Sequence, residues 1–136
     1  MYYSLKNSLI TMKLLIVLAL VAAALARPDD SHYDEKYDNF NIDEVITNER
    51  LLKNYAHCLI GDGKCTPEGN EFKKLLPEAT KSNCGKCTDK QKVHVAKAIK
   101  AIKEKLPTEY ETLRSQIDPE GAHAEDINKY VAKYAP

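Results

Sequence analysis

Apolar residues recur at intervals of three and four along this chain from about residue 41 to residue 134. That spacing is the period of an amphipathic α-helix, and no stretch shows the strict apolar–polar alternation of a half-buried strand. The clearest stripes are Leu51-Leu52-Tyr55-Leu59 and Val95-Ile99-Ile102-Leu106. The sequence therefore predicts an all-α protein with about six helices, most of them short.

Residues that cap or break helices divide this pattern into segments. Asn41 and Asn48 can each cap a short helix, and Thr66-Pro67 opens another, in which Pro77 is expected to cause a kink or an interruption. Residues 27–40 are mostly polar and are expected to form an extended arm.

The second half of the chain carries two capping-box patterns, each with Thr three residues before Gln or Glu. Thr88 and Gln91 precede the longest predicted helix, about 89–106. Thr108 and Glu111 are expected to open the next one. The segment 118–121 then breaks the chain before a final helix.

The first 26 residues have a different pattern. Lys13 precedes an apolar run that ends in Ala24-Leu25-Ala26, which predicts a secretory signal peptide cleaved after Ala26. The run is shorter than the roughly 20 apolar residues of a membrane-spanning helix. If translation starts at Met12, residues 1–11 are an upstream extension. The mature chain, 27–136, is then a single secreted, extracellular domain.

Composition excludes several classes of function. The 20 basic and 20 acidic residues balance, and removal of the signal segment leaves a net charge of −2, which argues against nucleic-acid binding. The four His residues are scattered without metal-ligand spacing. No phosphate loop or nucleophile motif occurs. We therefore expect no enzymatic activity, no metal and no cofactor.

The four cysteines follow the spacing Cys58-x6-Cys65-x18-Cys84-x2-Cys87. Four cysteines allow three pairings, and sequence distance favours the local one, in which Cys58 pairs with Cys65 and Cys84 with Cys87. A zinc site or a redox-active pair are the alternatives, and Lys86 beside Cys87 could lower a thiol pKa. The predicted secretion signal favours structural disulfides.

Several blocks of sequence resemble the insect chemosensory proteins. They are the cysteine spacing, the arm Tyr33-x3-Tyr37-Asp38-Asn39-x-Asn41-x-Asp43-Glu44, and the strings Asn48-x-Arg50-Leu51-Leu52, Gly63-Lys64-Cys65-Thr66-Pro67-Glu68-Gly69 and Lys86-Cys87-Thr88. The resemblance covers about residues 33–121. It implies a bundle of six helices around an apolar channel or cavity, with two local disulfides.

The resemblance also implies a function: reversible binding of hydrophobic small molecules such as fatty acids, long-chain esters, alcohols and semiochemicals. Tyr110 stands where many members of the family carry Trp. From the resemblance and the apolar stripes together, the candidate ligand-binding residues are Tyr33, Tyr37, Ile46, Leu52, Tyr55, Phe72, Leu76, Gln91, Val95, Ile99, Tyr110 and Leu113. We expect a monomer, without stable membrane insertion, whose partner is a hydrophobic ligand.

Two other classes of function fit a small, secreted, helical protein with disulfides. A saposin-like, membrane-interacting protein is favoured by the lysine-rich segment 73–105 and disfavoured by the net charge of −2. A developmental or structural secreted protein could carry a cavity in which ligand binding is incidental.

Overall fold

The computed structural model describes residues 2–25 and 32–136, which divide into two units, Met1–Asp30 and Ser31–Pro136. The first unit holds helix α1, Tyr2–Leu25, whose apolar residues between Ile10 and Val21 are exposed. None of the helices in the described ranges has the length and apolar character needed to cross a membrane. The predicted cleavage site at Ala26 lies outside the described residues, so the signal peptide stays a prediction.

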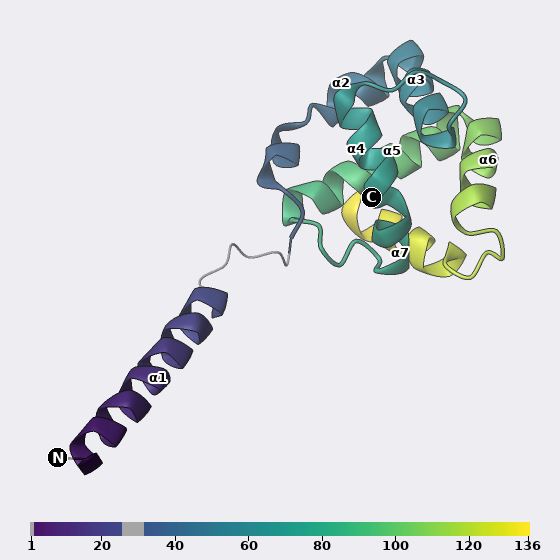
Figure 1. The fold of residues 1–136 in the computed structure, drawn as a ribbon. Coiled ribbons are helices and arrows are strands. Elements are labelled where there is room, and N and C mark those ends of the chain that lie inside the picture. The colour runs from purple at the N-terminus through teal and green to yellow at the C-terminus, as the bar shows by residue number, and fades with distance from the viewer. Residues whose placement is uncertain (1, 26–31) are drawn as a thin grey trace. The chain divides into compact units, whose positions relative to one another are not determined.

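Every element of secondary structure within residues 32–136 is a helix, which confirms the predicted all-α class (Figure 1). It contains the 3₁₀-helix η1 and six α-helices. Their bounds are η1 Glu35–Asn39, α2 Ile42–Thr47, α3 Glu49–Ile60, α4 Pro67–Lys81, α5 Asp89–Lys105, α6 Pro107–Ile117 and α7 Ala124–Tyr134.

Most helices begin at the predicted caps. The Asn48 side chain accepts a hydrogen bond from the Leu51 N–H at the start of α3. Thr88 and Gln91 form the predicted capping box of α5, with hydrogen bonds in both directions. These contacts satisfy backbone N–H groups that have no partner within the helix, which is why local sequence alone fixes the helix starts.

Two local predictions were wrong, and one of the two outcomes predicted for Pro77 does not occur. The arm is not extended throughout, because Glu35–Asn39 forms η1, which the Asp34 side chain caps by accepting from the Lys36 N–H. Helix α6 begins at Pro107, before the predicted Thr108 cap, since proline fits the first helical position. Pro77 does not interrupt α4, which continues to Lys81.

Helix α5 lies at the centre of the second unit and contacts η1, α2, α3, α6 and α7 (Figure 1). Its C-terminal turns and its middle contribute to two separate apolar clusters. Ala101, Ile102 and Leu106 pack with residues of α2 and α3, while Ala96 packs with Cys84, Cys87 and Tyr130. Helix α5 therefore carries part of both clusters, and Val95, Ala98 and Ile99 pack at their edges.

Both disulfides have the predicted local pairing. Cys58–Cys65 joins the end of α3 to the loop before α4, and Cys84–Cys87 closes the turn between α4 and α5. The buried Gly69 of α4 lies against the first disulfide, where an added Cβ would come within 3.0 Å of Cys58 Sγ. The absence of a side chain at Gly69 therefore permits the close approach of α3 and α4.

Candidate functional site

The larger of two apolar cavities lies among η1, α2, α3, α4 and α5 and has a volume of about 200 Å³. Its wall is almost entirely carbon. The lining residues are Tyr33, Tyr37, Phe40, Ile42, Val45, Leu52, Tyr55, Leu59, Phe72, Leu75, Leu76, Ala79, Cys87, Gln91, His94, Val95, Ala98, Ile99, Ile102 and Leu113. An apolar cavity of about 150 Å³ stays dry and binds benzene, so this space is suited to a hydrocarbon.

Four aromatic rings form a continuous part of this wall. Phe40 packs edge-to-face on Phe72 with a centroid separation of 5.0 Å, and on Tyr55 at 5.7 Å. Tyr37 also packs on Phe72, with a centroid separation of 5.5 Å. Through these rings η1 and Phe40, which follows it, pack against α3 and α4. The segment before α2 is therefore part of the cavity wall.

Most polar groups on this wall already bind other parts of the protein. The Tyr37 hydroxyl donates to the Glu71 carboxylate, and burial together with this bond raises the pKa of Tyr37. The Tyr55 hydroxyl accepts from Thr66 Oγ1 at 3.4 Å. The Gln91 amide donates to the Asp34 carbonyl at 2.9 Å. These groups hold η1 and α4 in place and leave their rings or stems facing the cavity.

Tyr33 differs from these residues. Its backbone N–H donates to the Lys86 carbonyl at 2.8 Å, which ties the start of the arm to the Cys84–Cys87 turn. Its hydroxyl oxygen is buried and has no hydrogen-bond partner within the described ranges. Burial, reinforced by the charge of Glu78 and opposed by Lys86, raises the pKa of Tyr33. The phenol therefore stays protonated at neutral pH.

The structure brings most of the predicted ligand-binding residues together. Those that line the larger cavity are Tyr33, Tyr37, Leu52, Tyr55, Phe72, Leu76, Gln91, Val95, Ile99 and Leu113. Tyr110 lines the smaller cavity instead. Ile46 packs against the core cluster of α2, α3 and α5 and lies on neither wall.

Sequence reasoning missed several lining residues. Ala98 and Ile102 share the α5 stripe with Val95 and Ile99, and the helical period could have identified them. His94 gave no such signal. Burial and the nearby Lys97 lower its pKa, against the weaker opposing charges of Asp38 and Asp43.

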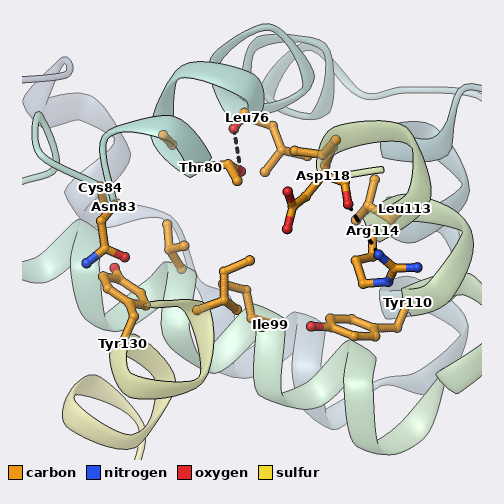
Figure 2. A pocket seen from close by; sticks show the side chains of 14 residues that line it. Leu76, Thr80, Asn83, Cys84, Ile99, Tyr110, Leu113, Arg114, Asp118 and Tyr130 are labelled. Atoms are coloured by element: carbon orange, nitrogen blue, oxygen red, sulfur yellow. Dashed lines mark hydrogen bonds between the residues drawn. The ribbon is translucent and has the colours of Figure 1, made fainter. Parts of the chain in front are cut away.

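The smaller cavity, of about 100 Å³, lies among α4, α5, α6 and α7 (Figure 2). It shares part of its wall with the larger cavity, namely Leu76, Ala79, Val95, Ile99 and Leu113. Figure 2 shows the Asp118 carboxylate projecting into this space, beside Leu113 and opposite Ile99. Asp118 is only 4% exposed, and one of its oxygens, Oδ2, accepts from the His123 N–H at 3.0 Å.

Three other polar side chains on this wall have partners in the protein. The Thr80 hydroxyl donates to the Leu76 carbonyl at 2.9 Å (Figure 2). The Tyr130 hydroxyl donates to the Lys92 carbonyl at 2.6 Å and joins α7 to α5. The Arg114 guanidinium donates to Glu111 and to the Asp118 carbonyl. In the part of the chain that the structure describes, no group of three His, Cys, Asp or Glu side chains is placed to hold a metal ion.

Comparison with known proteins identifies the family. The sequence profile of the insect pheromone-binding family A10/OS-D matches residues 33–125, which hold both disulfides and the whole lining of the larger cavity. The chain belongs to this family, the insect chemosensory proteins. The family resemblance inferred from the cysteine spacing and the arm is therefore confirmed.

Curated relatives match most of the chain. Allergen Tha p 1 of Thaumetopoea pityocampa is 44% identical over 115 residues, which cover 84% of this chain and 90% of the relative. Ejaculatory bulb-specific protein 3 of Drosophila melanogaster is 42% identical over 109 residues, covering 80% of this chain and 86% of the relative.

Solved structures share the fold. A chemosensory protein in complex with bromo-dodecanol superposes with a TM-score of 0.65 at 36% identity, covering 74% of this chain and 98% of that one. Antennal chemosensory protein A6 from the moth Mamestra brassicae gives a TM-score of 0.61 at 34% identity, covering 74% of this chain and 94% of that one.

Proposed function

We propose that this protein is a secreted carrier that reversibly binds hydrophobic small molecules in the larger cavity. Candidate ligands are long-chain alcohols, esters, fatty acids and semiochemicals of similar chemistry. The observation that carries the proposal is a space of about 200 Å³, partly open to solvent, whose wall is almost wholly apolar. A related protein of the same fold has bromo-dodecanol bound, which supports ligands of this length and polarity.

Burial of the alkyl chain supplies the affinity. Each methylene moved from water into an apolar cavity contributes about 0.8 kcal/mol, so a dodecyl chain gains roughly 9 kcal/mol before the entropy costs of binding. Micromolar affinity corresponds to about 8 kcal/mol. The lining needs no catalytic group for this function, and none of its polar groups forms a nucleophile–base pair.

Displacement of a fluorescent apolar probe tests the proposal. The chain has no Trp, so an external probe replaces intrinsic tryptophan fluorescence. Dodecanol, dodecyl acetate and hexadecanoate should displace the probe from the folded protein at low-micromolar concentration. Failure of all three, or equal probe binding by the reduced and unfolded chain, contradicts the proposal. The saposin-like alternative predicts dye release from liposomes, whereas a carrier should leave them intact.

Secretion is tested separately. Expression of the full chain in insect cells should place in the medium a product that begins at Arg27. Retention of the intact chain in the cell would contradict both the predicted signal peptide and the extracellular role.

A further inference from the structure

Asp118 is the one acidic side chain that lines either cavity, among the residues that the structure describes. It lies at the end of α6, where its own N–H donates to the Arg114 carbonyl at 2.8 Å. The rest of the smaller cavity is mostly apolar, with Ile99, Leu113 and Ile127 on its wall. A carboxylate that is 4% exposed beside such side chains is costly unless its oxygens accept hydrogen bonds.

Only part of that requirement is met by the protein. Oδ2 accepts the His123 N–H, a contact that fixes the turn between α6 and α7. Oδ1 accepts none of the hydrogen bonds found within residues 32–136, and unlike the buried Tyr33 hydroxyl it retains accessible surface. Arg114, which lines the same cavity, donates instead to the Asp118 backbone carbonyl and to Glu111. Figure 2 shows the carboxylate directed into the cavity rather than toward Arg114.

We infer that Asp118 Oδ1 accepts a hydrogen bond from the head group of the bound ligand, and that the protein therefore selects ligands whose head group is a donor, such as primary alcohols. This inference rests on the proposed function. An alcohol O–H can donate to a carboxylate, an ester or ether has no proton to donate, and an ionised fatty acid adds a second negative charge.

The two cavities allow one ligand to occupy both. The smaller space of about 100 Å³ cannot enclose a dodecyl chain, since one of about 150 Å³ is filled by benzene. Leu76, Ile99 and Leu113 border both spaces. Rotation of the two leucine side chains would open a path from Asp118 into the larger cavity. The head group then lies at Asp118 and the alkyl chain lies along α5.

Three ligands with the same alkyl chain test the inference: dodecanol, dodecyl methyl ether and dodecanoate. Each is titrated by probe displacement against the wild-type protein and Asp118→Asn. The amide keeps an oxygen for the His123 N–H, so the turn should remain folded. The control is Asp126→Asn, which neutralises an exposed carboxylate in the first turn of α7.

Asp118→Asn should weaken dodecanol binding about tenfold, because a hydrogen bond to a charged group is lost. Dodecanoate should bind the variant more tightly than it binds wild type. The ether should bind the variant at least as tightly as wild type, because the amide N–H of Asp118→Asn can donate to the ether oxygen. Asp126→Asn should match wild type with every ligand. Equal effects of Asp118→Asn on alcohol and ether, or no effect on any ligand, would overturn the inference. If wild type binds neither the probe nor any of the three ligands, the proposed function fails, and this inference fails with it.

Discussion

The two cavities share one wall and differ in how their polar groups are used. On the larger wall, Tyr37, Tyr55 and Gln91 bind neighbouring parts of the protein, so the surface offered to a ligand is mainly apolar. On the smaller wall, Asp118 presents a carboxylate that the protein satisfies only in part.

The two walls would serve different purposes in a carrier, one supplying affinity and the other selectivity. Apolar area supplies affinity for any ligand of suitable size, because burial of hydrocarbon does not depend on direction. A buried polar group supplies selectivity, because it must find a partner of the right kind. Leu76, Ile99 and Leu113 border both cavities, so one ligand can contact the apolar wall and Asp118 at the same time.

The largest expected effect is on the free energy of unfolding. It compares a substitution on the core side of the larger cavity with one on the wall that the two cavities share. Leu52 is 1% exposed, so Leu52→Ala should lower the free energy of unfolding by about 3 kcal/mol. Leu76→Ala should cost less, because Leu76 is half-buried and borders open space on two sides. Urea denaturation measures both values. An equal cost for the two substitutions would mean that the shared wall is packed as tightly as the core.

The two disulfides should have similar effects on stability and different effects on binding. Loop entropy predicts about 2.5 kcal/mol for the Cys58–Cys65 loop and about 2 kcal/mol for the Cys84–Cys87 loop. Cys84 lines the smaller cavity and Cys87 the larger, whereas Cys58 and Cys65 line neither.

Replacement of Cys84 and Cys87 together by Ala should therefore weaken binding of the apolar probe. The same double replacement at Cys58 and Cys65 should leave probe affinity unchanged at a temperature where both variants are folded. Thermal melts and probe titrations provide the two measurements. Loss of binding in the second variant alone would contradict the assignment of the cavity walls.

Removal of a tyrosine hydroxyl should lower stability on the smaller wall but not on the larger one. Tyr130→Phe deletes the donor to the Lys92 carbonyl and should cost about 1 kcal/mol. Tyr33→Phe removes a buried hydroxyl without a partner among the described residues, so it should raise or preserve the melting temperature. Differential scanning calorimetry of the two variants measures both changes in melting temperature. A clear loss of stability in Tyr33→Phe would show that this hydroxyl is satisfied after all.

The smallest effect should be a pH dependence from His94. Because burial and Lys97 lower its pKa in the folded protein, the unfolded chain binds a proton on His94 more readily. Stability from this residue is therefore present above about pH 6.5 and is lost as the pH falls toward the lower folded pKa. His94→Gln should flatten the stability profile between about pH 7 and pH 5. An unchanged slope would mean that His94 keeps its ordinary pKa in the fold.

Much of the fold could be predicted because local chemistry determines it. Asn48 and the Thr88–Gln91 pair mark the starts of α3 and α5 through contacts within three residues. Helix α6 was placed too late, since Thr108 matches a cap pattern as well as Pro107 matches a first helical position. The 3₁₀-helix at 35–39 is too short to show a periodic pattern.

The candidate site was predictable in part for the same reason. Val95 and Ile99 lie on a stripe that helical spacing reveals, and the family resemblance supplied Tyr33 and Tyr37. Asp118 was read only as part of a chain break. Its burial depends on how α6 and α7 pack around the break, and nothing in the local sequence encodes that packing.

Isotope-filtered NOE spectra of ¹³C-labelled protein with unlabelled dodecanol test the central claim most directly, because they locate the ligand. Leu52, Val45 and Ile102 line only the larger cavity. The account predicts NOEs from the alkyl chain to the methyl groups of these three residues, although they are buried. NOEs confined to exposed side chains, with none to these methyl groups, would contradict an internal binding site.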